Sequence, residues 1–208
     1  MILYVKCLVK VRILIRRVIV ITGTPGVGKS SISKILSLKI NSIIISLGEL
    51  VRKEKLYSGV DEGRDTLIAD LERVSKRVQE IILGSDRDVI VEGHFAPDVV
   101  PPEYVTMAFV LRRSPEELKH ILESRRYNEK KIAENLAAEI LDVCLYETVK
   151  RFGREKVCEI DVTSRDAEDA AQEILEVLSG LRERRVGIVD WLGKLEAENK
   201  LEEYLKEF

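Results

Sequence analysis

The sequence predicts an α/β protein in which a five-stranded parallel sheet is covered by helices on both faces. Short apolar runs rich in β-branched residues alternate with longer amphipathic segments, as is typical of parallel strands joined by helical crossovers. The first run, Val18–Thr22, leads directly into a glycine-rich segment, Gly23–Ser30. No Gly/Ser-rich or Pro-rich linker divides the 208 residues, so one domain over 18–208 is expected.

The glycine-rich segment reads GTPGVGKS and matches the pattern G-x-x-x-x-G-K-[ST] in full. Its glycines let several backbone N–H groups point at phosphate oxygens, and the helix that follows adds the positive end of its dipole. Lys29 is expected to reach the β- and γ-phosphates, and the Ser30 hydroxyl to bind Mg²⁺, which prefers oxygen ligands. The motif predicts a three-layer P-loop NTPase. The nucleotide-binding residues expected from the loop are Gly23, Gly26, Gly28, Lys29, Ser30 and Ser31.

The remaining elements follow from the pattern of apolar residues. Four more strands are expected at Ile43–Ile45, Val89–Glu92, Met107–Leu111 and Val157–Val162. Helices are expected at Lys29–Lys39, Leu47–Lys55, Leu67–Leu83, Lys130–Phe152, Asp166–Leu181 and Ile188–Leu205. A further helix starts at Ser114-Pro115, with Glu117 as the partner that completes a capping box. The loops after the five strands should line one cleft, because ligands bind beyond the carboxyl ends of parallel strands.

Residues 1–17 stand apart from this pattern. They are apolar but interrupted by charges at Lys6, Lys10 and Arg12, so no run is long enough to cross a membrane, and the charges come too late for a secretory signal. The alternation over 9–13 favours an edge strand. Because a phosphate-binding strand usually opens its domain, we interpret 1–17 as an appended N-terminal extension.

Composition excludes several classes of protein. The formal net charge of −2 argues against a surface built throughout to bind nucleic acid. The three cysteines, Cys7, Cys144 and Cys158, fit no metal motif, and with two histidines in the chain they predict reduced thiols and no zinc site. We expect a cytoplasmic protein that does not bind membranes. The aromatic residues Phe95, Phe109, Tyr104 and Trp191 are expected in the core or an interface rather than as a surface on which a base stacks.

The residues indicate a small kinase rather than another class of P-loop protein. A GTPase would carry N-K-x-D after a middle strand, and the nearest match, at 199–202, falls in the predicted terminal helix. The chain is also too short for a motor or a large ring ATPase. A short helical insertion after the second strand and an arginine-bearing segment after the fourth indicate a nucleoside monophosphate kinase.

Four segments make a more specific resemblance. They are Gly23–Ser30, Gly48–Tyr57 (GELVRKEKLY), Val89–His94 (VIVEGH) and Arg125–Ile132 (RRYNEKKI). Together they resemble the adenylate kinase isoenzyme six family of archaea and eukaryotes, whose members are described both as nucleotide kinases and as ribosome-assembly ATPases. The glycine loop is shared with many families, whereas Tyr-Asn-Glu-Lys-Lys in this position is selective.

The resemblance implies a role for each segment. Residues 46–69 would form the monophosphate-binding insertion, with Arg52 bound to the acceptor phosphate, and 124–134 a short lid, with Arg125 on the nucleotide and the transferring phosphoryl group. Glu92 would hold Mg²⁺ with Ser30, and His94 would position water or contact phosphate. The implied catalytic residues are Lys29, Arg125, His94 and Glu92. The family usually has Asp at position 92 and Gly at position 126, so Glu92 and Arg126 depart from its pattern.

For three residues a role outside catalysis and binding stays open as the less favoured alternative. Arg52 is flanked by Lys53 and Lys55 and could belong to a solvated helix face. Arg125 could be a surface arginine in a basic cluster, and His94 a hydrogen-bonded structural histidine.

Two functions also stay open. The first is a broad-specificity nucleoside monophosphate kinase that converts ATP and AMP to two ADP with Mg²⁺, with ATPase activity and a role in small-subunit ribosome maturation. The second is a nucleotide-gated ribosome-assembly ATPase with residual kinase activity. In either, the implied partners are a small-subunit ribosomal protein and pre-rRNA. A 5′-polynucleotide kinase is less favoured, because no extended basic groove is evident.

Overall fold

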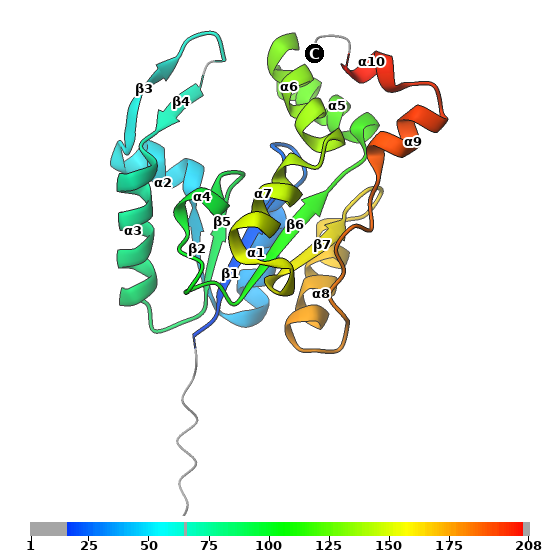
Figure 1. Ribbon diagram of the computed structural model, residues 1–208. Helices are drawn as coiled ribbons and strands as arrows, with labels where there is room; N and C mark the ends of the chain where they lie inside the picture. Colours follow the sequence, from blue (N-terminus) through cyan, green and yellow to red (C-terminus); the bar gives the residue numbers. More distant parts are fainter. Residues whose placement is uncertain (1–15, 65, 206–208) are drawn as a thin grey trace, which may run out of the picture.

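The computed structural model describes residues 16–64 and 66–205, and Figure 1 shows a central sheet between layers of helices. The strand order is β2-β5-β1-β6-β7, and all neighbouring strands are parallel. The five strands are β1 (Val18–Thr22), β2 (Ile43–Ser46), β5 (Val89–Glu92), β6 (Met107–Arg112) and β7 (Val157–Asp161). The predicted five-stranded parallel sheet is confirmed, with each strand end within one residue of the expected one.

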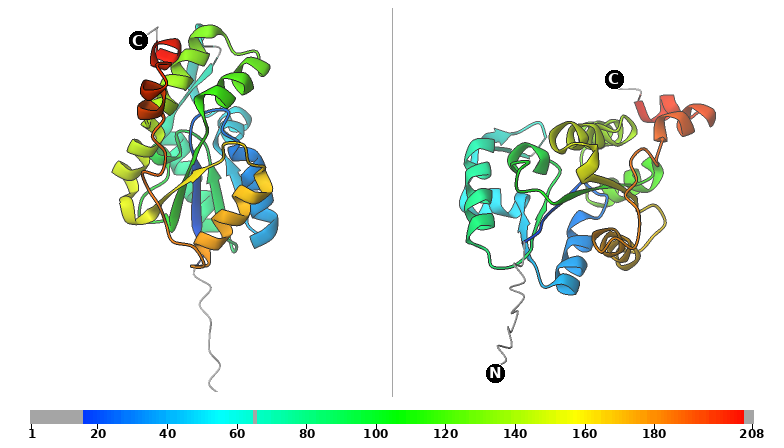
Figure 2. Two further views of the ribbon diagram at one scale, coloured as in Figure 1. Left: turned by 90° about the vertical axis from the view of Figure 1, so that its right-hand side faces the viewer. Right: turned by 60° about the horizontal axis from the view of Figure 1, so that its bottom comes forward.

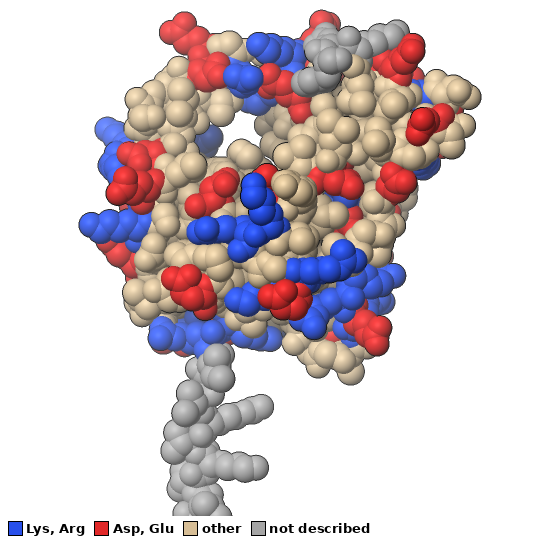
Figure 3. Space-filling view, in the orientation of Figure 1, with Lys and Arg blue, Asp and Glu red and all other residues tan. Residues whose placement is uncertain are grey.

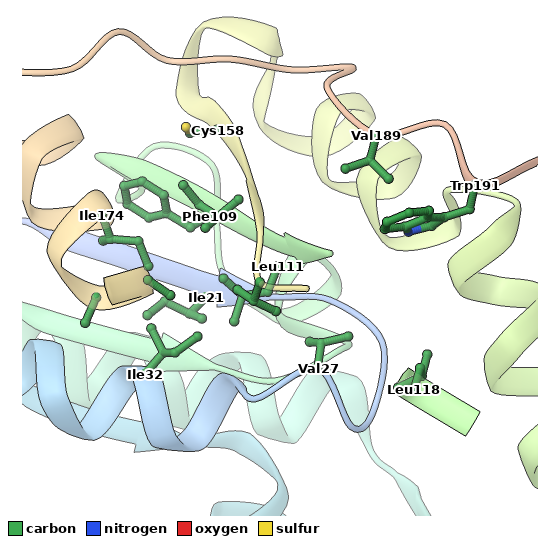
Figure 4. Packing of buried hydrophobic residues seen from close by; sticks show 14 of the residues in the cluster. Ile21, Val27, Ile32, Phe109, Leu111, Leu118, Cys158, Ile174, Val189 and Trp191 are labelled. Atoms are coloured by element: carbon green, nitrogen blue, oxygen red, sulfur yellow. The ribbon is translucent and has the colours of Figure 1, made fainter. Parts of the chain in front are cut away.

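The helices cover both faces of this sheet. Successive side chains of β1 point to opposite faces, as in any strand, so Ile19 and Ile21 enter one core cluster and Val18 and Val20 the other. Figure 4 shows Ile21 in the first cluster, between Ile32 and Phe109. The first cluster lies under α1 (Lys29–Ile40) and α8 (Ala167–Leu178), and the second under α3 (Leu71–Gly84), α4 (Ala96–Val99) and α7 (Val143–Phe152).

The remaining helices gather mainly beyond the carboxyl ends of the strands, at the top of Figure 1. Among them α6 contacts α5, α9 and α10, and Figure 2 shows the same grouping from the side. The helices of this group are α2 (Leu47–Glu54), α5 (Pro115–Ser124), α6 (Glu129–Ile140), α9 (Trp191–Ala197) and α10 (Leu201–Leu205). A short 3₁₀ turn, η1 (Arg154–Lys156), precedes β7.

The insertion over 46–69 consists of α2 followed by a β-hairpin, so the expected short helical insertion is correct in its first half and wrong in its second, where a polar stretch and the start of a helix were expected. Strands β3 (Tyr57–Asp61) and β4 (Thr66–Ala69) pair antiparallel after α2. Their residues alternate between exposed and half-buried, a period of two that favours a strand. The helix expected from Leu67 therefore begins at Leu71, where the Asp70 carboxylate accepts from the Arg73 backbone N–H at 3.1 Å.

The helix expected over Lys130–Phe152 is two helices, α6 and α7. Asp142 adopts a left-handed conformation with φ of 57°, and its carboxylate pairs with the Arg112 guanidinium. Arg112 Nη2 also donates to the Glu139 carbonyl at 2.9 Å, at the end of α6. The end of α6 is thus bound by a cation from a distant strand, and the local pattern of apolar residues cannot predict this break in the helix.

Three other helix predictions also need correction. The helix expected over Ile188–Leu205 is divided into α9 and α10, with Asn199 between them at a φ of 55°, and α8 ends at Leu178 rather than Leu181. Ser114 caps α5 as predicted, since its hydroxyl accepts from the Glu117 N–H at 3.3 Å. The Glu117 carboxylate does not complete the capping box, because it accepts from Ser164 at 2.8 Å and pairs with Arg113.

The predicted N-terminal extension lies outside the described residues, apart from its last two positions. Arg17 is tied to the domain: its backbone N–H and its Nε donate to the Asp88 carboxylate at 2.8 and 2.7 Å. The thiols of Cys144 and Cys158 are free, and Cys7 lies outside the described residues. In the described part of the chain, no helix is long and apolar enough to cross a membrane.

Candidate active site

The glycine loop joins β1 to α1 and needs its glycines for space as well as for conformation. Gly23 and Gly26 have φ of 132° and 105°, which side chains with a Cβ rarely adopt. A Cβ on Gly23 would lie 2.5 Å from the Leu111 carbonyl oxygen, and one on Gly26 2.7 Å from a Leu118 methyl carbon. The loop therefore lies against β6 and α5 as bare backbone, and the free N–H groups at the start of α1 face the cleft.

Lys29 folds back onto this loop. Its Nζ donates to the carbonyls of Gly23 at 2.7 Å and Thr24 at 3.0 Å. The pKa of Lys29 is lowered to about 8, mainly because the loop encloses it and also because Arg125 is near, while Cys144, Glu92 and Glu139 oppose the shift. Backbone carbonyls are exchangeable partners, so the ammonium can turn to a phosphate that enters the loop.

Ser30 and Glu92 meet on the other side of the loop. The Ser30 hydroxyl lies 3.1 Å from both carboxylate oxygens of Glu92, which ends β5 and is 6 % exposed. A hydroxyl and a carboxylate beside a phosphate site are the hard oxygen donors that suit Mg²⁺. Within the described residues no group of three or more His, Cys, Asp and Glu converges.

Two cavities adjoin at this place. The first, of about 310 Å³, contains the loop residues Gly26, Gly28, Lys29, Ser30 and Ser31 together with Glu92 and Arg125. The second, of about 590 Å³, lies between α2, the β3–β4 hairpin and α6, and contains Arg52, Tyr57, Val60, Leu67 and Lys131. We call them the phosphate cavity and the acceptor cavity. Their shared wall consists of Gly48, His94 and Phe95.

His94 stands on this shared wall. No described residue hydrogen-bonds its ring, which meets Phe95 edge-on with 5.1 Å between ring centres. Although the side chain is open to the cavities, loss of water in the cleft, with Lys29 and Lys131 nearby, lowers the pKa of His94 to about 4. The imidazole is therefore neutral at pH 7 and has a free acceptor nitrogen. This placement does not favour a hydrogen-bonded structural histidine.

The two candidate arginines lie in different cavities. Arg52 on α2 lines the acceptor cavity, and Arg125, which follows α5, lines the phosphate cavity. Both side chains are exposed, and neither pairs with a carboxylate of the described residues. Arg125 is close enough to Lys29 to lower its pKa. Their positions make both guanidinium groups available to anions in the cleft. A surface arginine outside the cleft would not be placed in this way.

The cleft prediction holds for three of the five loops. Residues after β1, β2 and β5 line the phosphate cavity, whereas those after β6 and β7 do not. Phe109 and Trp191 are buried as expected. Phe95 and Tyr104 are half-buried and pack against the second core cluster, and Phe95 also lines both cavities.

Sequence reasoning missed the buried group that holds the glycine loop from behind. The Thr24 hydroxyl donates to Glu139 at 2.6 Å, and Glu139 also accepts from Arg112 Nε at 2.9 Å and from Trp191 Nε1 at 3.3 Å. Arg112 in turn pairs with Glu159 at 2.5 Å. A carboxylate on a helix carries no local sign that it will be buried, so this role of Glu139 could not be predicted from the sequence.

Comparison with known proteins agrees with this geometry. Residues 19–142 match a family described as "AAA domain". A protein of Methanocaldococcus jannaschii named "Putative adenylate kinase" is 43% identical over 176 residues, which cover 85% of this chain and 93% of that protein. A protein of the same name from Methanosarcina barkeri is 41% identical over 181 residues, covering 83% and 96%. The chain belongs to the family of P-loop proteins that these relatives represent.

Solved structures show the same fold at low identity. Shikimate kinase from Bacteroides thetaiotaomicron aligns with a TM-score of 0.52 at 19% identity, over 78% of this chain and 98% of that one. Thymidylate kinase from Candida albicans aligns with a TM-score of 0.52 at 15% identity, over 80% and 92%. The predicted three-layer α/β P-loop fold is confirmed.

Proposed function

We propose that this member of the family is a nucleoside monophosphate kinase, which transfers the γ-phosphoryl group of ATP to AMP or another monophosphate. The observation that carries the proposal is the pair of cavities that meet at Gly48, His94 and Phe95. One cavity contains the glycine loop and the other contains an unpaired arginine, Arg52. A donor triphosphate and an acceptor monophosphate bound there would meet at the shared wall.

On the donor side, the loop N–H groups and Lys29 bind the phosphates of ATP. Lys29 leaves the carbonyls of Gly23 and Thr24 for the β- and γ-phosphates, which as anions are stronger partners than neutral carbonyls. Ser30 and Glu92 are the residues that would hold Mg²⁺. When bound, the ion supplies positive charge against that of the phosphates.

On the acceptor side, Arg52 orients the monophosphate. A phosphate oxygen of the acceptor attacks the γ-phosphorus of ATP while the bond from that phosphorus to the β–γ bridging oxygen breaks. The acceptor becomes a diphosphate and ADP leaves. Arg125 stabilises the negative charge spread over the transferring oxygens. The residues Val51, Tyr57, Val60, Leu67 and Phe95 give the acceptor cavity a largely apolar lining, which suits several bases rather than one.

The decisive experiment measures ADP formation from Mg-ATP with and without AMP. We expect a strong rise with AMP, and two ADP for each AMP consumed. His94→Ala is compared with His120→Ala, since His120 is exposed on α5 away from both cavities. ADP formed at an AMP-independent rate, and lost in His94→Ala alone, would overturn the kinase as the main activity.

A second comparison tests the acceptor site itself. Arg52→Ala should raise the KM for AMP roughly 10- to 100-fold, the effect of losing a charged hydrogen bond to phosphate, and leave AMP-independent ATP hydrolysis unchanged. The control is Lys53→Ala, because Lys53 is the exposed neighbour on α2 outside the cavity. Equal effects in the two variants would contradict the assignment of Arg52.

One observation supports the switching ATPase as a second candidate. A neutral His94 with a free ring nitrogen at the shared wall can accept a hydrogen bond from a water molecule beside the γ-phosphate. ATP hydrolysis would then open and close the cleft, as in other nucleotide switches. The resemblance adds a small-subunit ribosomal protein and pre-rRNA as partners. Nucleotide-dependent binding to ribosomal particles, measured by co-sedimentation, tests that addition directly.

A further inference from the structure

The tip of the β3–β4 hairpin meets α6 through a cluster of charged side chains. Arg64 Nε and Nη2 donate to the two carboxylate oxygens of Glu134 at 2.8 and 2.7 Å. Arg64 Nη1 and its backbone N–H donate to Asp61 at 2.8 and 3.0 Å. One guanidinium therefore joins the first strand of the hairpin to α6, whose first half lies within the predicted lid, in the two-point geometry that favours Arg over Lys.

Two further side chains of α6 reach the same tip. Lys131 Nζ donates to the Arg64 carbonyl at 3.0 Å and to the Thr66 hydroxyl at 2.9 Å, and it lies 4.4 Å from the centre of the Tyr127 ring. Asn128 Nδ2 donates to the Gly63 carbonyl at 3.3 Å, while its Oδ1 caps α6. The start of α6 and its contact with the hairpin are thus made by the same residue.

This contact lies over the acceptor cavity. Lys131 lines the cavity together with Thr66 and Leu67 of the second hairpin strand. Figure 3 shows an opening between the part that carries the hairpin and the part that carries α6, with charged side chains of both signs closing it at the top. The cluster therefore spans the acceptor cavity instead of stiffening either part alone.

The cluster is suited to repeated opening. The side chains of Arg64, Glu134 and Asp61 are 47%, 28% and 30% exposed. Ion pairs this open to solvent contribute little to folding stability and weaken as salt is added. Contacts that are specific in geometry but weak in energy can form and break in each cycle of binding and release.

We propose that Arg64, Glu134 and Lys131 are positioning residues that hold the hairpin against α6 over a bound acceptor, a role that rests on the proposed kinase function. With the contact formed, the acceptor phosphate stays beside the shared wall and bulk water is kept from the γ-phosphate. With it broken, the acceptor binds more weakly and water competes for the phosphoryl group. None of the three residues touches the reacting atoms.

The test uses the whole chain and four variants: Arg64→Ala, Glu134→Ala, Lys131→Ala and the charge swap Arg64→Glu with Glu134→Arg. In the charge swap, the relocated arginine faces both Asp61 and the new glutamate. For each single variant we expect the KM for AMP to rise roughly 2- to 5-fold with a smaller change in kcat. We also expect a larger fraction of ATP to be hydrolysed in the presence of AMP. The charge swap should return the KM to near the wild-type value.

Backbone hydrogen exchange over 57–69 supplies a readout that needs no activity. Without nucleotide, the backbone amides over 57–69 should exchange roughly 3- to 10-fold faster in the single variants than in wild type. In the charge-swap variant they should return to the wild-type rate. Lys130→Ala is the matched control for Lys131→Ala, because Lys130 is its exposed neighbour on α6. Single variants whose amide exchange and KM match wild type, or a charge-swap variant that does not recover, would overturn the proposal. If the single variants exchange their amides faster but wild type shows no AMP-dependent phosphoryl transfer, the proposed function would be overturned instead.

Discussion

Two positions on α6 carry the same kind of interaction in opposite surroundings. Near its C-terminus Glu139 pairs with Arg112, and both side chains are 1% exposed. In the middle of the helix Glu134 pairs with Arg64, and both are open to solvent. The first pair holds the glycine loop through Thr24, whereas the second joins the insertion over 46–69 through the hairpin. One helix therefore touches both halves of the cleft.

Burial decides what each pair can do. Taking Glu139 and Arg112 out of water is costly, and the carboxylate is satisfied because Thr24, Trp191 and the Arg113 backbone N–H donate to it as well. Removing Glu139 leaves Arg112 with Glu159 and Asp142 only, and it leaves the buried donors of Thr24, Trp191 and Arg113 without their acceptor. The exposed pair leaves no such groups unsatisfied when it opens, since water replaces the partner. The comparison separates a permanent anchor from a reversible contact.

The largest expected effect comes from breaking the anchor. Glu139→Ala should lower the free energy of unfolding by about 3–5 kcal/mol, because Arg112 loses one of its two buried carboxylates and three buried donors lose their acceptor, and lower the Tm by roughly 6–20 °C. Glu139→Gln keeps the shape and should fold with a smaller loss. Denaturant and thermal unfolding measure both, against Glu134→Ala, which should unfold nearly as wild type does. Equal losses at the two positions would break the comparison.

The next effect concerns Lys29, which lies in the loop that the anchor holds. Since the pKa of Lys29 is lowered to about 8, its ammonium is present below that pH and is lost as the pH rises through it. The Kd of Mg-ATP should therefore rise roughly tenfold between pH 7 and pH 9.5. Calorimetric titration measures this. Lys29→Ala should bind weakly at both pH values, and a wild-type Kd independent of pH would contradict the enclosed lysine.

A smaller effect is expected at Arg126, in the turn before the exposed end of α6. Its φ of 59° is left-handed, which costs a residue with a Cβ about 1–2 kcal/mol, while glycine there loses about 0.5–1 kcal/mol of unfolded-state entropy. Arg126→Gly should thus stabilise the protein by up to about 1 kcal/mol, and Arg126→Val should destabilise it. Urea unfolding decides, and clear destabilisation by glycine would show that the arginine makes contacts worth more than the strain.

The smallest expected effect is that of salt, which should weaken the exposed ion pair of α6 and leave the buried one nearly unchanged. Because the screening length falls from about 10 Å at 0.1 M to about 3 Å at 1 M, high salt should raise hydrogen exchange over 57–69 in wild type toward the rate in Arg64→Ala. The loss of stability in Glu139→Gln should change little over the same range. A hairpin whose exchange ignores salt would indicate that apolar packing, and not the ion pair, holds it.

Much of the fold could be predicted from the chain alone. The strands are short apolar runs whose periodicity is local, and the glycine loop is a contiguous motif with a strand before it and a helix after it. The hairpin was mistaken for polar loop and helix, because Thr66–Ala69 is too short to separate the two periods. The break at Asp142 could not be predicted, because the cation that causes it comes from β6.

The candidate site divides in the same way. Lys29 and Ser30 were named from the glycine-loop motif, and Glu92, His94, Arg52 and Arg125 from the resemblance. All of them line the two cavities, while their roles stay proposals. The resemblance implied that 46–69 binds the monophosphate, but no pattern indicated the hairpin within it or the partners of Glu139.

By itself the sequence determined the sheet, its covering helices and the phosphate loop, because these depend on periodicity and on contiguous residues. Only the tertiary structure decided which of two similar carboxylates on α6 is an anchor and which a reversible contact. Glu134 and Glu139 lie five residues apart on one helix, so they point to different sides of it. One side faces the core and the other the hairpin, and the surroundings of each charge, not its identity, set its energy.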